Sequence, residues 1–259
     1  MDTLFAGLSQ HGHTLSDVVA ILVTHIHLDH SGSVGTLIRR NGGIRAFVHG
    51  RGARHLIDPT RLLRSAARVF GSKMDELWGE VDAVPAANVE IVEDGRTIGP
   101  AGRDIDVLYT PGHAVHHVTY YDRTSRTAFV GDTAGMRIEE AGYVMPVAPP
   151  PDVDLAAWRD SLQRLRNLAP ERLFLTHFGS SDDVDRHLEI MEDKLAEWAR
   201  DVRSLLACYP DERGASRAFT EKYLGEMRSR VPESLQHRYE SFASPVDSFR
   251  GISLYLRRQ

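Results

Sequence analysis

The first half of the chain alternates between apolar residues at helical spacing and short continuous apolar runs. Helical spacing predicts a helix over residues 3–10, and the β-branched run 18–23 predicts a strand that is buried on both faces. A short helix over 33–40 and a strand over 44–48 follow, separated by an Asn-Gly-Gly turn. Helices that alternate with buried strands indicate a layered α/β arrangement.

A helical stretch from about 59 to 79 interrupts this alternation. Its apolar side chains include Phe70, Met74 and Trp78, and its low β-propensity predicts an insertion over one face of the sheet. Two uses are open for these side chains. They form an apolar lid over a functional site, or they pack against the sheet.

Apolar runs then predict a second group of strands. These strands are expected at 89–92, 105–109, 118–121, 128–130 and 173–175, with an amphipathic helix around Trp158 before the last of them. After the last of these strands we expect only helices.

The C-terminal part of the chain has helical spacing. A 4-3-4-3 apolar pattern predicts one long amphipathic helix over 184–207, and the tail from residue 215 also reads as helical. Two alternatives are open for the apolar stripe of this long helix: it packs on its own domain, or it pairs with the same helix of a second copy in a homodimer. Two regions follow from this organisation: an α/β core over 1–180 and a helical extension over 181–259 that packs on the core.

Composition narrows the class of protein. The chain has 259 residues, of which 42% are hydrophobic and 26% charged, and its net charge is −5, which excludes a collagen or a low-complexity polymer. Cys208 is the only cysteine, so no intramolecular disulfide forms and a reducing compartment is favoured. Without an apolar run of about 18 residues or a signal peptide, we expect a cytoplasmic protein with no membrane partner. The mild negative charge argues against a nucleic-acid surface.

Three histidines and an aspartate are crowded directly behind the first strand, at His25, His27, Asp29 and His30. Alternation along an extended chain places His25 and His27 on one side, and the following turn aims the other two toward the same point. Because a buried carboxylate without a partner is costly, core packing explains this group poorly. Imidazole nitrogens and a carboxylate at the end of a rigid strand are what a divalent metal ion requires.

Three more polar residues end apolar runs in the same way. His113 lies in a Thr-Pro-Gly-His segment, Asp132 in a Gly-Asp-Thr segment and His177 in a Thr-His segment, each directly after a predicted strand. The neighbouring Gly or Pro residues let the backbone turn sharply into a cleft. A Gly-Asp pair is also common in simple turns, but repetition of the arrangement at four strand ends indicates one site.

The motifs Thr-His-Ile-His-Leu-Asp-His-Ser-Gly, Pro-Gly-His, Gly-Asp and Thr-His, in this order, resemble those of metallo-β-lactamase-fold hydrolases over about residues 15–180. The resemblance implies a four-layer αβ/βα sandwich with a metal site at one edge of its two sheets. It also implies two divalent metal ions, zinc foremost, with iron or manganese as alternatives. His25, His27 and His113 would hold one ion, Asp29, His30 and His177 the other, and Asp132 would bridge them.

The chemistry implied is metal-assisted hydrolysis of a small molecule. Bound metal ions lower the pKa of water toward about 7, so that a metal-bound hydroxide attacks the substrate, and they polarise the bond under attack. Catalysis would rest on Asp29 and Asp132. Asp29 has two interpretations, a ligand of the second ion or a general base, and the neighbouring His30 favours the ligand. His117, four residues after His113, is expected to orient the metal ligands without binding a metal ion itself.

Within this family the sequence favours a hydrolase of small esters, thioesters or lactones, similar to hydroxyacylglutathione hydrolases and quorum-signal lactonases. The lactonases place a tyrosine three residues after the bridging aspartate, where this chain has Gly135. Tyr143, in the loop 135–151, is the available substitute. Two alternatives stay open: a mononuclear iron persulfide dioxygenase, and a non-catalytic binding protein of the same fold.

The histidine-rich motif starts early, and only one helix fits before it, whereas relatives place two or three strands there. The half-sheet would then lack its usual N-terminal strands and would expose an edge and apolar surface. We expect either a shortened start or cover by a neighbouring chain. An unpaired edge at 44–48 would favour the shortened start.

Overall fold

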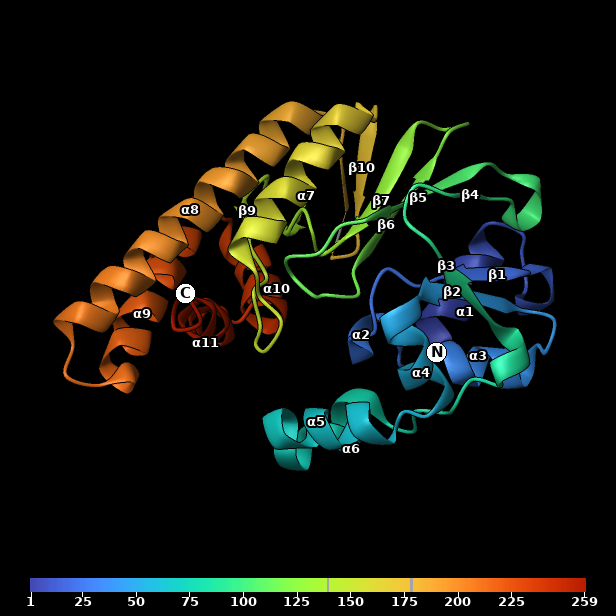
Figure 1. The fold of residues 1–259 in the computed structure, drawn as a ribbon, viewed down its shortest axis with the longest axis horizontal. Coiled ribbons are helices and arrows are strands. Elements are labelled where there is room, and N and C mark those ends of the chain that lie inside the picture. Colours follow the sequence, from blue (N-terminus) through green and yellow to red (C-terminus); the bar gives the residue numbers. More distant parts are fainter. Residues whose placement is uncertain (139, 178) are drawn as a thin grey trace. The chain divides into compact units, whose positions relative to one another are not determined.

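The computed structural model describes residues 1–138, 140–177 and 179–259. The chain divides into two compact units, residues 1–108 and 109–259, each with its own strands and helices (Figure 1). The predicted boundary at residue 180, between a core and a C-terminal extension, stays a prediction.

The first unit consists of short helices around a small sheet. Its helices are α1 (Asp2–Gln10), α2 (Leu28–Ser31), α3 (Val34–Arg40), α4 (Gly50–Ile57), α5 (Thr60–Phe70) and α6 (Met74–Trp78), and its strands are β1 (Ala20–Leu22), β2 (Arg45–His49), β3 (Val89–Val92), β4 (Thr97–Ile98) and β5 (Ile105–Tyr109). Short 3₁₀ turns lie at Leu15–Asp17, Gly71–Lys73, Ala86–Asn88 and Pro100–Gly102.

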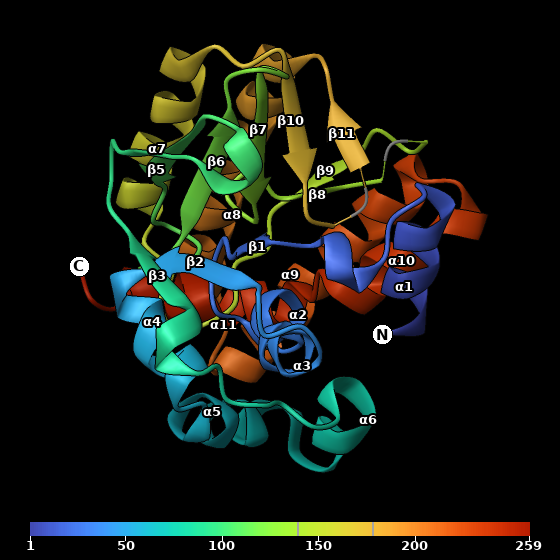
Figure 2. The same ribbon diagram turned by 90° about the vertical axis from the view of Figure 1, so that its right-hand side faces the viewer.

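Strands β1, β2 and β3 form a parallel sheet with β2 in the middle, and β4 pairs antiparallel with β5. Ala46 and Val48 of β2 are completely buried, and they share a core with apolar residues of α3 and α4. Both helices lie along this sheet in Figure 2. The parallel pairing explains the apolar character of β2, because parallel strands are covered on their faces.

The segment 44–48 is not the unpaired edge that would have favoured a shortened start, because Ala46 of β2 pairs with Ile21 of β1 on one side and with Val89 of β3 on the other. One expectation about this sheet was wrong. The run 18–23 is not buried on both faces: β1 is half-buried, and Val19 is 49% exposed. Among the described residues β1 is an outer strand of its sheet, which accounts for its partial exposure.

The helical structure predicted at about 59–79 is present as α5 and α6, which extend beyond α4 in Figures 1 and 2. Leu62 packs against the core of the unit. Phe70 and Trp78 pack on each other, with their ring centroids 5.3 Å apart. Use of these side chains as a lid over a functional site stays a prediction.

The second unit contains a further set of strands and all of the long helices. Its strands are β6 (Val118–Asp122), β7 (Thr127–Gly131), β8 (Met136–Arg137), β9 (Val144–Met145), β10 (Arg172–Leu175) and β11 (Gly179–Ser181), and its helices are α7 (Leu155–Leu168), α8 (Val184–Cys208), α9 (Glu212–Arg230), α10 (Glu233–Phe242) and α11 (Pro245–Leu256).

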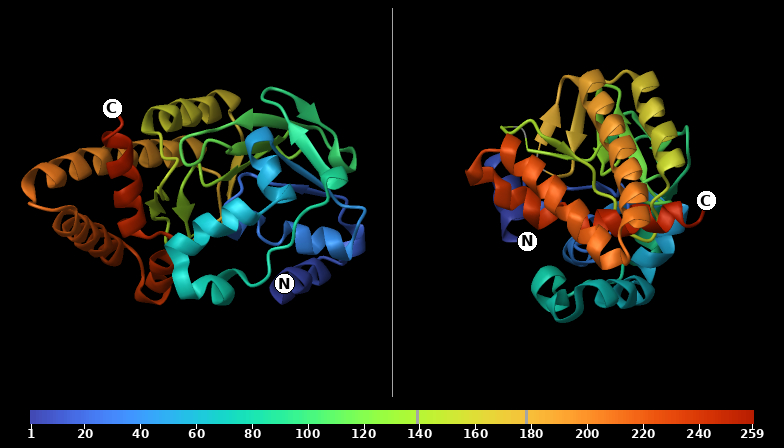
Figure 3. Two further views of the ribbon diagram at one scale, coloured as in Figure 1. Left: turned by 60° about the horizontal axis from the view of Figure 1, so that its bottom comes forward. Right: turned by 90° about the vertical axis from the view of Figure 1, so that its left-hand side faces the viewer.

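Four of these strands are neighbours in the order β11-β10-β7-β6. Strands β7 and β10 are parallel, and β6 and β11 flank them antiparallel. Helices α7 and α8 run side by side across these strands (Figure 3), and the completely buried Trp158 and Leu188 lie on them. The expectation that no strand follows residue 175 was wrong, because β11 comes after it. This strand was missed because its sequence, Gly-Ser-Ser, contains no apolar run. The predicted loop 135–151 contains the β8–β9 hairpin, and its residue 139 lies outside the described residues.

The C-terminal helices share an aromatic core. The ring of Trp198 on α8 lies 5.3 Å from that of Phe219 and 4.9 Å from that of Tyr223, both on α9, and Phe249 of α11 continues the cluster. All four side chains are completely buried, so the apolar stripe of α8 packs within its own unit. Homodimer formation stays a prediction. None of the described helices combines the length and the apolar character that crossing a bilayer needs.

A buried histidine joins α8 to the segment that follows β7. His187 is 1% exposed, and its Nε2 donates to the carbonyl oxygen of Ala134 at 2.8 Å. Burial lowers the pKa of His187 to about 4, because the charged imidazolium loses its hydration.

His187 is therefore expected to make stability fall in mild acid. Its folded-state pKa lies below the unfolded value, so its contribution is complete above about pH 6.5 and is lost as pH falls toward 4, by roughly 3 kcal/mol in all. In urea unfolding between pH 7 and 4.5, His187→Gln should show a flatter pH dependence than wild type, while the exposed His237→Gln should not. Equal slopes for wild type and His187→Gln would contradict this account.

Candidate metal centre

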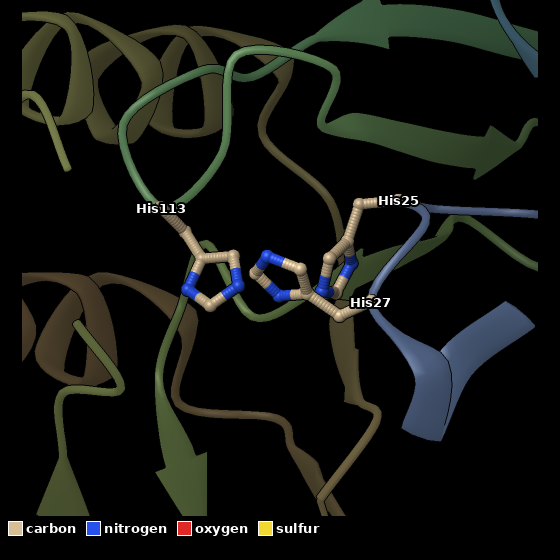
Figure 4. A group of neighbouring side chains, drawn as sticks. All are labelled: His25, His27 and His113. Atoms are coloured by element: carbon tan, nitrogen blue, oxygen red, sulfur yellow. The ribbon is translucent and has the colours of Figure 1, made fainter. Parts of the chain in front are cut away.

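The first ligand cluster, defined as His25, His27, Asp29 and His30, begins where the chain leaves β1. The amide of Val23 still donates to Phe47 O at 2.9 Å, after which the backbone turns out of the sheet into α2. The Ser31 hydroxyl closes this turn by donating to Ile26 O at 3.1 Å. Figure 4 draws His25 and His27 on the segment after β1, together with His113 on the loop after β5.

The side chains of this cluster are close together. Ring centroids are 4.6 Å apart for His25 and His27 and 3.9 Å apart for His25 and His30. His30 Nε2 lies 3.1 Å from Asp29 Oδ2. In each of these three pairs the ligand atoms lie within 4.8 Å of each other. His25 is completely buried, whereas the Asp29 side chain is 35% exposed.

The second ligand cluster, defined as His113, Asp132 and His177, surrounds one carboxylate. His113 Nε2 lies 3.4 Å from Asp132 Oδ2, and His177 Nε2 lies 3.4 Å from Asp132 Oδ1. Each oxygen of the carboxylate therefore faces a different imidazole. Asp132 is only 2% exposed, so this arrangement is shielded from bulk water.

Parallel pairing explains why Asp132 and His177 meet. Strand β7 ends at Gly131 and β10 ends at Leu175, and these two residues are register partners. Because the carboxyl ends of parallel strands lie at the same edge, the residues that follow them emerge side by side. The strand-end prediction for this pair is thus explained by the topology of the sheet.

The Pro-Gly-His segment is held against α7. Gly112 has φ +138°, and a Cβ atom there would lie 2.3 Å from Trp158 Cβ, so only glycine fits. The hydroxyl of Ser161 donates to Pro111 O at 2.6 Å. His113 Nδ1 lies 2.7 Å from Val147 O, so it carries the proton and leaves the Nε2 lone pair directed at Asp132.

His117 supports the cluster without being a ligand. Its Nε2 accepts from the backbone amide of Asp132 at 3.1 Å, so its Nδ1 is protonated. That Nδ1 lies 3.0 Å from the hydroxyl oxygens of both Thr110 and Thr133. Because both nitrogens are used, His117 fixes the backbone that presents Asp132, as the spacing of four residues suggested.

Tyr143 packs among the C-terminal helices. Its ring lies 5.7 Å from that of Tyr239, and Lys194 Nζ lies 5.9 Å from its centre. Burial, and then the neighbouring Glu226 carboxylate, raise the pKa of Tyr143. Use of Tyr143 as a substitute for the lactonase tyrosine stays a prediction.

Sequence reasoning missed three residues that contact the second cluster or its supporting His117. Thr110 and Thr133 anchor His117, and the ring of Phe242 on α10 lies 5.6 Å from that of His177. The two threonines lie beside motif residues in the sequence, and this proximity is the signal that could have identified them. Phe242 follows His177 by 65 positions in a helical segment, and no spacing rule connects them.

Comparison with known proteins places these clusters in a family context. The family model of the metallo-beta-lactamase superfamily matches residues 1–177. The protein ST1585 of Sulfurisphaera tokodaii, a metallo-beta-lactamase fold-containing protein, is 28% identical over 179 residues, covering 67% of this chain and 66% of the relative. Its solved structure covers 69% of this chain and 67% of its own with a TM-score of 0.57.

Two further relatives bear on function. A hydroxyacylglutathione hydrolase of Aeromonas hydrophila is 26% identical over 239 residues, covering 89% of this chain and 78% of the relative. TTHA1623, solved in a di-iron-bound form, is 28% identical with a TM-score of 0.52, covering 73% of this chain and 80% of its own. In the first four curated relatives the match spans only between 32% and 66% of their own length.

Substitution of Gly112 by alanine should destabilise the protein. The new Cβ would collide with Trp158, and a positive φ is strained for alanine, so a loss of about 2–5 kcal/mol is expected. Gly225 is the matched control, because it lies exposed within α9 with no atom within 4 Å of an added Cβ. Gly225→Ala should instead stabilise by about 0.5–1 kcal/mol. Urea midpoints measure both, and equal midpoints for the two variants would contradict the packing described.

Proposed function

Because this chain belongs to the metallo-beta-lactamase superfamily, whose members are generally hydrolases, we propose that it is a dinuclear metal-dependent hydrolase. The substrate class proposed is a small ester, thioester or lactone. The mixed α/β fold with a helical C-terminal region is that of the superfamily. The relatives named hydroxyacylglutathione hydrolase support a hydrolytic reaction.

The observation that carries the proposal is the position of the Asp132 carboxylate. Its two oxygens face two different histidines at 3.4 Å each, which suits a carboxylate that gives one oxygen to each of two metal ions. Neutral imidazoles with a carboxylate form a donor set of the kind that zinc, iron and manganese accept. The chemistry of the donors therefore fits two divalent ions, with zinc as the first expectation.

We assign the ligands by combining the two clusters. The di-iron-bound form of the relative TTHA1623 supports a two-ion site in this family. The proposed sets are His25, His27 and His113 for one ion, Asp29, His30 and His177 for the other, and Asp132 between them.

When bound, the ions would supply a hydroxide nucleophile near neutral pH and polarise the carbonyl under attack. The chain's own contribution is orientation and proton handling. The hydrogen bond from His113 Nδ1 to Val147 O fixes the tautomer and the orientation of the imidazole, and His117 holds the backbone of Asp132. Asp29 is the most exposed of the proposed ligands, so solvent reaches its carboxylate. In the proposed two-ion site Asp29 is a ligand, and with one ion it would be the general base.

Metal content and substrate turnover together test the proposal. Purified protein should hold close to two transition-metal ions per chain and should hydrolyse members of a panel of aryl esters, thioesters and lactones. His27→Ala and Asp132→Ala should each lower kcat/KM at least about 100-fold, because each removes a proposed ligand. His237→Ala is the control, since His237 is exposed on α10, and its activity should equal that of wild type.

Two outcomes would contradict the proposal. Iron as the only metal, with oxygen consumption on a persulfide, would indicate the mononuclear dioxygenase instead. Protein that binds no metal in metal-replete medium and hydrolyses nothing would indicate the non-catalytic binding protein.

A further inference from the structure

Phe242 is an exposed aromatic residue beside a proposed metal ligand. It is the last residue of α10 and is 47% exposed. Its ring centroid lies 5.6 Å from that of His177, with the planes tilted by 38°. This distance is that of a direct ring contact. One side of the phenyl ring therefore covers His177, while about half of the side chain is accessible to another molecule.

The end of α10 is held in place by a buried tyrosine one turn earlier. Tyr239 is completely buried; its hydroxyl donates to Tyr143 O at 2.6 Å and accepts from the amide of Ile138 at 3.0 Å. These two partners lie inside the β8–β9 hairpin, at the two ends of the connection between its strands, and the hairpin begins four residues after Asp132. Residues three apart lie on the same side of a helix, so Tyr239 also fixes where Phe242 points. The hairpin thus links Phe242 to the segment that presents Asp132.

Other exposed phenylalanines of the second unit lie in a different setting. Phe129 and Phe174 are register partners on β7 and β10, 38% and 48% exposed, with their rings 5.4 Å apart. Such a cross-strand aromatic pair stabilises a sheet, and each ring has the other as its partner. Phe242 contacts a proposed ligand instead, which marks it as part of the site.

We propose that Phe242 contacts the substrate and selects an apolar acyl or aryl group. This inference rests on the proposed hydrolase function and names its substrate class more narrowly. A phenyl ring has no charge and no hydrogen-bond donor, so it is suited to bind hydrocarbon rather than a carboxylate. Because Phe242 adjoins the ligand His177, a group attached to the bond under attack would lie within reach of the ring. Tyr239 is the positioning residue for this contact.

Kinetics on aryl esters of increasing acyl length test the inference. For the hexanoyl ester, Phe242→Ala should raise KM about tenfold with little change in kcat, because the contact serves binding and not the chemical step. For the acetyl ester the change in KM should be below about twofold. Phe242→Leu, which keeps an apolar side chain, should recover most of the hexanoyl KM. Phe174→Ala, a truncation at equal exposure, should behave as wild type.

Calorimetry supplies a readout that does not depend on turnover. Wild type should bind hexanoate more tightly than acetate. Phe242→Ala should bind hexanoate about tenfold more weakly than wild type while keeping its metal content. Tyr239→Phe should weaken hexanoate binding in the same direction, since it removes the hydroxyl that holds α10.

The failures of the two ideas are distinguishable. If wild type hydrolyses the esters and Phe242→Ala shows unchanged KM and hexanoate affinity, the inference fails while the hydrolase function stands. If wild type hydrolyses no member of the panel of esters, thioesters and lactones, the proposed function fails. Loss or retention of hexanoate binding in Phe242→Ala then still decides whether Phe242 contacts a ligand.

Discussion

The burial of one carboxylate is the constraint around which the second unit is organised. Asp132 is 2% exposed, and burying an ionised carboxylate costs several kcal/mol unless close partners compensate it. His113 and His177 each face one oxygen of the carboxylate at 3.4 Å, but the Nε2 of His113 carries no proton to donate to it. The compensating positive charge would therefore come from the proposed metal ions. The backbone amide of Asp132 is held by His117, which is itself fixed by two threonines, so the position of the carboxylate is set in advance.

The ends of the paired strands determine where this carboxylate and its neighbours lie in the fold. The parallel pairing of β7 and β10 brings Gly131 and Leu175 into register, so the residues after them emerge at one edge. Strict turns then direct the side chains: Gly112 fits against Trp158 only because it has no Cβ, and the indole of Trp158 donates to Thr133 O at 2.7 Å. Helix α7 therefore braces both the Pro-Gly-His segment and the segment after Asp132. The ligands thus lie on loops, and these loops are fixed by the rigid strands and by α7.

Much of this was predictable from the sequence because the signals are local. Buried strands such as β2 and β7 are apolar runs, and α8 has an unbroken apolar stripe. Polar residues that follow such runs were recognisable as a site by repetition. Other features could not be predicted because the local pattern carries no information about them. Strand β11 has the sequence Gly-Ser-Ser, which contains no apolar run. The position of β2 in its sheet depends on which strands pair with it. An apolar run reports burial and leaves strand order open, so the sequence could not decide whether 44–48 is an edge.

The missed contributors to the site share a physical cause. Phe242 and Tyr239 act through contacts between residues about 65 to 101 positions apart, and such contacts are set only when helices pack on the rest of the unit. Tyr239 reads in the sequence as one apolar position of an ordinary helix, yet its hydroxyl satisfies two backbone groups of the β8–β9 hairpin. Because those backbone groups are buried, leaving them without a partner would be costly, so the helix and the hairpin are energetically coupled. The C-terminal helices are in this way part of the structure that surrounds His177. The proposed substrate contact of Phe242 and the proposed ligands Asp132 and His177 thus depend on the same packed unit.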